Sequence, residues 1–389
     1  MSIDKEGAIK VLSIFGTRPE AIKMAPVIKA LDCASGIDGR VCVTGQHREM
    51  LDQVLSLFDI SPDYDLDLMK PGQDLTDIMV GVMCGLKPII SHCKPNLILV
   101  HGDTTTTLAG ALAAYYQGIP VGHVEAGLRT GNIMSPWPEE MNRKATSVIA
   151  AINFAPTERA RANLIAEGVR PETIVITGNT VIDSLLHVVD RQDNISPAVT
   201  ALSGGAKFDC SKKMILVTGH RRESFGEGFE RICKAISQIA RRRDVEIVYP
   251  VHLNPNVKGP VEAALTGLGN VHLIPPQEYV PFVRLMNSST IIITDSGGIQ
   301  EEAPALGKPV LVMRETTERP EAVEAGTVKL VGTDINLIVA SANELLDNSD
   351  AYEAMSRAHN PFGDGKASER IISTIKEWWT RTRSPRNPR

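Results

Sequence analysis

The sequence predicts an α/β protein with a parallel β-sheet in each half of the chain. Two observations favour this fold class: short runs rich in β-branched residues alternate with longer stretches of helical periodicity, and the same alternation recurs in the second half. Apolar strands that are each followed by a helix form parallel sheets with crossover helices. With 389 residues, the chain is long enough for two or three domains that each bury a core.

The expected strands of the first half are short, apolar and rich in β-branched residues. They are Ile9–Phe15, Gly39–Thr44, Leu97–Val100, Val121–Val124 and Ile174–Thr177. The expected helices lie between these strands and repeat apolar residues at the helical period. They are Ala21–Leu31, Arg48–Leu57, Leu75–Cys93 and Thr105–Gln117.

The second half repeats this order of elements. Its expected strands are Met214–Thr218, Glu246–Pro250, Val271–Ile274, Thr290–Thr294 and Pro309–Met313. Its expected helices are Phe229–Arg242, Tyr279–Asn287 and Ile299–Leu306. The polar stretch Arg191–Cys210 is one candidate for the linker between the halves, and a break near Gly178 is equally possible. We expect the basic tail, Arg381–Arg389, to be frayed.

Composition and charge narrow the class of protein. The 41 basic and 46 acidic residues give a net charge of -5, which argues against nucleic acid as a partner. No apolar run approaches the ~18 residues of a membrane span, and the first residues do not resemble a signal peptide. The six cysteines include no Cys-x-x-Cys pair, which indicates reduced thiols rather than disulfides or a zinc site. We therefore expect a cytoplasmic enzyme without membrane, nucleic-acid or metal partners.

Ligands of parallel sheets bind beyond the carboxyl ends of the strands. After the first expected strand, the turn Gly16–Glu20 carries Arg18 and leads to a helix that carries Lys23. Such a turn can bind an anion, and the two cations would strengthen the contact. Taken alone, these residues are better explained by a tight turn with Pro19 at the first helical position. The chain has neither a Gly-x-Gly-x-x-Gly fingerprint nor a Walker motif, so we expect no nicotinamide cofactor.

Three carboxylates follow strands of the first sheet. Asp103 could cap the helix that follows it, Glu125 could form a surface ion pair, and Glu139 could decorate the start of a helix. As a set at one edge of a sheet, however, they are typical of acid–base catalysis, because burial and crowding raise carboxyl pKa values into a useful range.

In the second half of the chain, the residues that follow the expected strands are suited to bind a phosphate group. His220 and Arg221 follow the first of these strands, and His252 follows the next. The sequence Ser296–Gly298 enters a helix and would present free N–H groups to a diphosphate. Glu302, one turn into that helix, could accept hydrogen bonds from both hydroxyls of a ribose.

Together these motifs resemble the non-hydrolysing UDP-N-acetylglucosamine 2-epimerase family. The resemblance extends from Gly16 to about Gly365, and its most specific motifs are His101–Thr107, His123–Thr130, Gly219–Ser224 and Asp295–Ala303. It implies two Rossmann-like domains of the glycosyltransferase-B type, with the nucleotide in the interdomain cleft. The implied domains are residues 1–178, onto which the C-terminal helix in 366–389 packs back, and residues 179–365, which bind the nucleotide.

The family's functional residues carry over to matching positions of this chain. The resemblance implies catalytic roles for Asp103, Glu125, Glu139 and His220. It implies substrate contacts for Arg18, Lys23, Gln277, Phe282, Ser296, Gly297, Gly298, Glu302 and Arg319. It also implies a second, regulatory nucleotide-sugar site near Gln46, His47, Arg221 and His252.

The implied reaction is the reversible conversion of UDP-N-acetylglucosamine (UDP-GlcNAc) to UDP-N-acetylmannosamine (UDP-ManNAc). It needs no cofactor, and in the family it supplies N-acetylmannosamine for cell-surface polysaccharides. By the same resemblance we expect a homodimer. The strongest competing function is a UDP-sugar glycosyltransferase on the same fold, since a fold does not determine a function. A hydrolysing epimerase is a second competitor, and a non-catalytic nucleotide-sugar sensor is a third.

Overall fold

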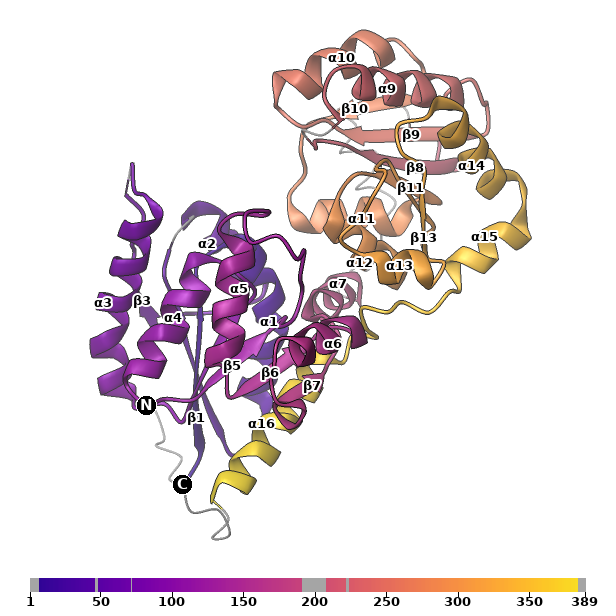
Figure 1. Cartoon of the computed structure of the whole chain (residues 1–389). Helices are drawn as coiled ribbons and strands as arrows, with labels where there is room; N and C mark the ends of the chain where they lie inside the picture. The colour runs from indigo at the N-terminus through magenta and orange to yellow at the C-terminus, as the bar shows by residue number, and fades with distance from the viewer. Residues whose placement is uncertain (1–6, 46–47, 71, 191–207, 222–223, 384–389) are drawn as a thin grey trace. The chain divides into compact units, whose positions relative to one another are not determined.

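The computed structural model describes residues 7–45, 48–70, 72–190, 208–221 and 224–383. The chain forms two compact units (Figure 1). Unit 1 comprises residues up to Ser184 together with those from Phe362 onward, and unit 2 comprises Leu185–Pro361. Unit 2 is therefore inserted between two segments of unit 1.

Unit 1 is built on a parallel sheet of seven strands in the order β3-β2-β1-β4-β5-β6-β7. Each neighbouring pair in this sheet is parallel, and β1 lies between β2 and β4. The strands are β1 (Ile9–Phe15), β2 (Ile37–Val43), β3 (Tyr64–Asp65), β4 (Leu97–His101), β5 (Val121–Val124), β6 (Ile152–Ala155) and β7 (Ile174–Ile176).

The helices of unit 1 cross between these strands. They are α1 (Arg18–Cys33), α2 (Arg48–Leu57), α3 (Leu75–Cys93), α4 (Thr105–Tyr116), α5 (Glu139–Ile149), α6 (Glu158–Ala166), α7 (Thr180–Asp190, which runs into unit 2) and α16 (Ala367–Arg383), with a 3₁₀ turn η1 (Pro171–Thr173). Helices α3 and α4 bury apolar side chains against β1 and β4, and α16 packs against α1 (Figure 1). Burial of this kind is the main source of stability in such domains.

Unit 2 has a parallel sheet of six strands in the order β10-β9-β8-β11-β12-β13. Its strands are β8 (Lys213–Thr218), β9 (Val245–Pro250), β10 (Val271–Ile274), β11 (Ile291–Thr294), β12 (Val310–Val312) and β13 (Val328–Leu330). Its helices are α9 (Glu227–Ile239), α10 (Pro255–Leu265), α11 (Tyr279–Ser288), α12 (Gly297–Ala305), α13 (Pro320–Glu324), α14 (Ile335–Asp347) and α15 (Ser349–Ser356). One apolar cluster from the sheet and helices α9, α10 and α14 forms its core.

The predicted fold class is confirmed: both sheets are parallel and both are crossed by helices. Strands β3, β6 and β13, which span 2, 4 and 3 residues, were not predicted. The proposed linker Arg191–Cys210 lies largely outside the described residues.

The chain passes between the units twice, and the two passages touch within unit 1. The backbone N–H of Asn179 donates a hydrogen bond of 2.7 Å to the carbonyl oxygen of Phe362. A Cβ atom on Gly178 would lie 3.3 Å from the Cα atom of Gly363, so neither position has room for a larger side chain. Just beyond, Asp183 accepts hydrogen bonds from the first N–H groups of α16.

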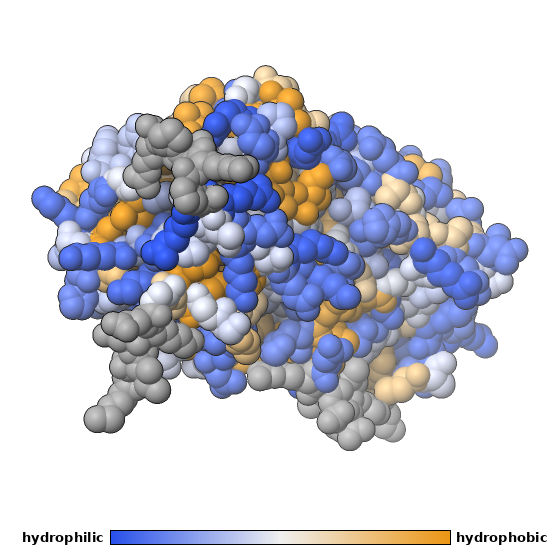
Figure 2. Space-filling model, turned by 90° about the horizontal axis from the view of Figure 1, so that it is seen from below, coloured by the Kyte–Doolittle hydropathy of each residue, from blue (hydrophilic) through white to orange (hydrophobic). Residues whose placement is uncertain are grey.

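The face of the molecule seen in Figure 2 is predominantly hydrophilic, with separate apolar patches. In the part of the chain that the structure describes, no helix is long and apolar enough to cross a bilayer. All six cysteines lie in that part, and none of them forms a disulfide.

Candidate active site

Three turns of unit 1 meet at the carboxyl edge of its sheet. Strand β1 leads to Gly16 and Thr17, β4 leads to Gly102 and Asp103, and β5 leads to Glu125. Because β4 pairs with both β1 and β5, these turns are neighbours. This is the edge at which parallel sheets bind ligands.

Glu125 has a strained backbone and a nearly buried side chain. Its φ is 65°, a left-handed conformation that is uncommon for a residue other than glycine. Oε1 forms an ion pair with Lys23 and accepts a hydrogen bond of 2.8 Å from Nδ2 of Asn179. Backbone strain of this kind concentrates at functional sites. The structure therefore brings together two predicted site residues, Lys23 and Glu125.

Asp103 lies beside Glu125. A Cβ atom on Gly102 would lie 3.5 Å from Oε2 of Glu125, which places that carboxylate against the Gly102–Asp103 turn. The Asp103 carboxylate accepts a short hydrogen bond from Nη2 of Arg143, and its carbonyl oxygen accepts one of 2.9 Å from Nδ2 of Asn142. Burial raises the pKa of Asp103, the Arg143 guanidinium opposes this, and the charge of Glu125 raises the pKa further.

The alternative in which Asp103 caps a helix is wrong. Thr104 is the N-cap of α4, and its Oγ1 accepts the N–H of Thr107 at 3.1 Å. The Asp103 carboxylate is directed instead toward Arg143 on α5. This leaves it beside Glu125.

Glu139 is the first residue of α5, one turn before the residues of that helix that reach Asp103. Its negative charge contributes to the raised pKa of Asp103. Its neighbour Glu140 is fully buried and accepts hydrogen bonds from the backbone N–H groups of Thr130 and Gly131, at 3.1 and 3.2 Å. Glu140 therefore braces the loop before α5, and Glu139 is the more exposed member of the pair.

Two histidines beneath this edge are neutral. Burial lowers the pKa of His101 to about 3 and that of His123 to about 4. Nε2 of His123 lies 2.7 Å from the carbonyl oxygen of Gly102, and because a carbonyl only accepts, the neutral ring carries its proton on Nε2. Nε2 of His101 lies 3.6 Å from Oε2 of Glu125, but a neutral ring forms no ion pair there.

Glu20 joins two of the turns. Its Oε2 accepts hydrogen bonds from the backbone N–H groups of Gly16 and Thr17, at 3.1 and 2.8 Å. Its Oε1 accepts hydrogen bonds from the hydroxyls of Thr104 and Thr107, at 2.7 and 3.2 Å. The unusual run of threonines at the start of α4 therefore has a structural role. Arg18 follows this braced turn directly, as the first residue of α1.

In unit 2, the buried carboxylate of Asp295 holds the turn after β8. Its Oδ2 accepts the backbone N–H groups of His220 and Arg221 at 2.7 and 2.8 Å. Nδ1 of His220 lies 3.4 Å from Oδ1 of Asp295, and the His220 ring stacks on that of His252, with centroids 5.6 Å apart. The resemblance assigns His220 and His252 to different sites, yet their rings are in contact.

The amino end of α12 adjoins the same turn. The helix begins at Gly297 with Ser296 as its N-cap, and in the described structure no side-chain hydrogen bond caps it. A Cβ atom on Gly297 would lie 3.7 Å from Nη2 of Arg221. N–H groups, a helix dipole and a guanidinium together form a site for a phosphate or diphosphate.

The remaining predicted contacts of unit 2 lie around α11 and α12. Arg319 forms an ion pair with Glu301, and a Cβ atom on Gly298 would lie 3.7 Å from Oε1 of Glu302. Gln277 donates a hydrogen bond of 2.7 Å to the carbonyl oxygen of Pro275, just before α11. Phe282 lies on α11 and is partly buried. Gln46 and His47, predicted to bind a regulatory nucleotide, lie outside the described residues.

Comparisons with known proteins agree on one family. The sequence pattern of the family described as UDP-N-acetylglucosamine 2-epimerase matches residues 29–376. The UDP-N-acetylglucosamine 2-epimerase of Escherichia coli K12 is 61% identical over 370 residues, which are 95% of this chain and 98% of that protein. The chain belongs to the UDP-N-acetylglucosamine 2-epimerase family.

Solved structures of the epimerase family have the same fold. The UDP-GlcNAc 2-epimerase of Neisseria meningitidis bound to UDP-GlcNAc is 52% identical, with a TM-score of 0.84 over 95% of this chain and all of that one (100%). A putative UDP-N-acetylglucosamine 2-epimerase from Listeria monocytogenes is 47% identical, with a TM-score of 0.90 over 98% of this chain and 100% of that one. The identification of the family from sequence motifs is therefore confirmed.

Four residues that support the epimerase site were not predicted to belong to it. Glu20, Arg143, Asn179 and Asp295 are buried or half-buried and hydrogen-bond either predicted site residues or the turns that carry them. Asp295 and Asn179 each follow a strand closely, which is the one signal that could have indicated them. The residues to which Asn179 and Asp295 hydrogen-bond in the site, Glu125 and His220, are distant in sequence, so no local sequence pattern indicates these bonds.

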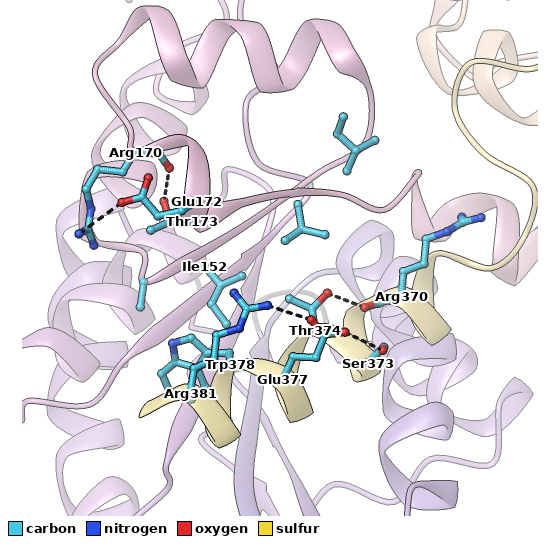
Figure 3. Close-up of a pocket in the computed structure, with 13 residues that line it drawn as sticks. Ile152, Arg170, Glu172, Thr173, Arg370, Ser373, Thr374, Glu377, Trp378 and Arg381 are labelled. Carbon is cyan, nitrogen blue, oxygen red and sulfur yellow. Dashed lines mark hydrogen bonds and ion pairs between the residues drawn. The ribbon is translucent and has the colours of Figure 1, made fainter. Parts of the chain in front are cut away.

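A cavity of about 520 Å³ lies elsewhere in unit 1, between α16 and strands β6 and β7 (Figure 3). Ile152 and Trp378 contribute to its apolar lining, and Arg170 and Arg381 form ion pairs with Glu172 and Glu377 in its wall. None of the predicted site residues that the structure describes lines it. Among the described residues there is also no group of three His, Cys, Asp or Glu placed to hold a metal ion.

Proposed function

We propose that this protein interconverts UDP-GlcNAc and UDP-ManNAc by eliminating UDP and adding it back. The hydrogen on carbon 2 of the sugar is not acidic, because no carbonyl group adjoins that carbon. Its removal becomes feasible when the bond from carbon 1 to the UDP oxygen breaks as the proton leaves. The electron pair of the C–H bond then forms the double bond of 2-acetamidoglucal, and UDP departs with the electrons of the C–O bond.

The return step inverts carbon 2. The UDP oxygen adds to carbon 1 while a proton reaches carbon 2 on the opposite face from the one that lost it. The reaction therefore needs proton acceptors or donors on both faces of the sugar, and it needs stabilisation of the departing diphosphate. No electrons are exchanged with a cofactor.

We assign proton transfer to Asp103, Glu125 and Glu139 together. The observation that carries this proposal is the group of carboxylates at one sheet edge, in which burial and like charge raise the pKa of Asp103. A raised pKa makes a carboxyl group both a usable acid and a usable base near neutral pH. Lys23, which is paired with Glu125, and Arg18 would contact the sugar–diphosphate region.

We assign nucleotide binding to unit 2. The N–H groups of α12 at Ser296–Gly298 would bind the diphosphate, with His220 stabilising the charge as UDP departs. Glu302 would accept the ribose hydroxyls, and Gln277, Phe282 and Arg319 would complete the nucleotide site. Asp295 supports this assignment, because it fixes the turn that carries His220 beside α12.

Incubation with UDP-GlcNAc in deuterated water tests the reaction. The proposal predicts UDP-ManNAc with deuterium at carbon 2 in the absence of any acceptor. A glycosyltransferase would leave carbon 2 unlabelled without an acceptor, a hydrolysing epimerase would release free N-acetylmannosamine, and a sensor would bind without turnover. Scrambling of an isotopic label from the oxygen that bridges sugar and phosphate tests the elimination step, since inversion without scrambling contradicts it.

We further propose that a second UDP-GlcNAc molecule activates the enzyme at a regulatory site that includes Gln46, His47, Arg221 and His252. Sigmoidal dependence of the rate on UDP-GlcNAc is expected, and it should become hyperbolic in His252→Ala. Hyperbolic kinetics in both proteins would contradict the proposal.

We also propose that the protein is a cytoplasmic homodimer that supplies N-acetylmannosamine for cell-surface polysaccharides. Helices α3, α4 and α5 are neighbours, and they expose the large apolar side chains Val80, Tyr115, Tyr116 and Val148. Such a surface suits a second copy of the chain. Sedimentation of Tyr116→Glu is expected to show a monomer where the unaltered protein shows a dimer, and a monomeric unaltered protein would contradict the proposal.

A further inference from the structure

Asn179 lies where the chain first leaves unit 1, and its backbone N–H, its Oδ1 and its Nδ2 are all hydrogen-bonded. It is 2% exposed and lies in the chain between β7 and α7. Its backbone N–H bonds the returning chain at Phe362, and its Oδ1 accepts the N–H of Val181 at 3.1 Å. Its Nδ2 donates to Oε1 of Glu125 at 2.8 Å.

These bonds determine the orientation of the Asn179 amide. Because Oδ1 must face the N–H of Val181, only the NH₂ group can face Glu125. The amide therefore presents a donor to the carboxylate, and a buried carboxylate is stabilised by the donors around it. The backbone at Glu125 is strained, so its carboxylate depends on side-chain partners for its direction.

We infer that Asn179 is a positioning residue that orients the Glu125 carboxylate and ties it to the crossing of the chain between the two units. The inference rests on the proposed role of Glu125 in proton transfer. Asn179 affects catalysis only by orienting Glu125, and it does not itself take part in the reaction.

Asn179 is neutral, but several charged or titratable groups also face Glu125. They must be considered when the pH dependence of kcat is interpreted. They are Lys23 on α1, Asp103 after β4, and the neutral rings of His101 and His123 on β4 and β5. None of them is changed by a substitution at Asn179, so a shift in the pH profile of such a variant reports the change at residue 179 itself.

Asn179→Asp is the most informative variant. Aspartate retains an oxygen that can accept the N–H of Val181, and the backbone bond to Phe362 is unaffected, so the helix cap and the crossing remain. The donor to Glu125 is replaced by a negative charge. We expect kcat to fall about 10- to 100-fold with KM changed less than about threefold, and the acidic limb of the kcat profile to move to higher pH by about one unit.

Asn179→Ser removes the donor without adding charge and preserves a capping hydroxyl. It should lower kcat about tenfold and move the acidic limb of the profile to higher pH by less than the aspartate variant does, which covers the case in which the aspartate variant does not fold. Asn348→Asp is the matched control, because Asn348 also caps a helix, with its Oδ1 accepting the N–H of Asp350 at 3.0 Å. It should leave kcat and the profile unchanged.

Glu125→Gln separates this inference from the proposed function. If that variant is inactive while Asn179→Asp retains the kcat and pH profile of the unaltered enzyme, the inference is wrong and the proposed function stands. If Glu125→Gln turns over UDP-GlcNAc at the unaltered rate, the proposed role of Glu125 in proton transfer is overturned, and the inference about Asn179 falls with it.

Discussion

The two units share one architecture but differ in the chemistry of their sheet edges. In unit 1 the turns after β4 and β5 carry the carboxylates Asp103 and Glu125, each paired with a cation from a helix. In unit 2 the turn after β8 is held by a buried carboxylate, and the adjoining feature is the amino end of α12 with Arg221 beside it. Unit 1 is thus suited to move protons and unit 2 to bind phosphate.

The difference indicates that a parallel sheet determines where side chains are placed, and that the identity of those side chains determines the chemistry. In both units a buried acid braces a turn: Glu20 joins two turns in unit 1, and Asp295 holds one in unit 2. The residues that follow the braced turns then decide what the edge can do. A substitution in one unit can therefore be tested both on the property assigned to that unit and on the property assigned to the other, namely the epimerisation rate for unit 1 and nucleotide binding for unit 2.

The largest effect is expected from the carboxylates of unit 1. Asp103→Asn and Glu125→Gln should each lower the epimerisation rate by about 10²- to 10⁴-fold, since each removes a group that transfers a proton. The affinity for UDP, measured by calorimetry, should change less than about threefold, because an interaction confined to the transition state is lost. Near-native turnover of either variant, measured as deuterium incorporation at carbon 2, would remove that residue from the mechanism.

A substitution in unit 2 should have the opposite signature. Glu302→Ala is expected to raise KM for UDP-GlcNAc by about 10- to 100-fold and to weaken UDP binding equally, because charged hydrogen bonds to the ribose are lost. The value of kcat should remain within a few-fold. Glu262→Ala, at an exposed position of α10, is the control and should change neither quantity. A fall in kcat with KM unchanged would contradict the division of roles between the units.

The bracing role of Glu20 predicts a loss of stability. Glu20→Gln places an NH₂ group among N–H and O–H donors, so the free energy of unfolding should fall by about 2 kcal/mol. Urea unfolding of this variant should be compared with that of Glu158→Gln, an exposed first-turn position of α6 where less than about 0.5 kcal/mol is expected. Equal losses in the two variants would show that Glu20 is not a brace.

The smallest effect concerns Glu318 in unit 2. A two-pronged hydrogen bond from Arg314 lowers the pKa of Glu318 to about 2 from 4.5, so this pair stabilises the fold above pH 4.5 and loses that contribution as the pH falls toward 2. Because Glu318 is partly exposed, we expect only about 1 kcal/mol. The stability difference between Glu318→Gln and the unaltered protein should shrink by more than half of that amount between pH 7 and pH 3, and a difference independent of pH would contradict the assignment.

Much of the fold could be predicted from the sequence, because long apolar runs and strong helical periodicity are local properties. Strands β1 and β5 and helices α2 and α3 have the predicted bounds. Strands β3 and β13 were missed, since they owe their extended backbone to pairing with β2 and β12 rather than to their own residues.

Candidate site residues could be predicted where they directly follow strands. Residues that support the site by hydrogen-bonding to those residues or to their turns could not. Asp103, Glu125 and Ser296 could be found because parallel strands bring their carboxyl ends to one edge. The bond from Asn179 to Glu125 joins residues 54 positions apart, and the bond from His220 to Asp295 joins residues 75 apart. Such pairings arise from tertiary approach, which no local pattern encodes.

The close approach of Gly178 and Gly363 affects how unit 2 could be exchanged for the corresponding segment of a relative. The segment 185–361 leaves and rejoins its host at a single point, as a cassette does whose two ends lie side by side. Exchange of this cassette with that of a relative would require both junction glycines to be transferred together, since a methyl group at either would force the junctions apart.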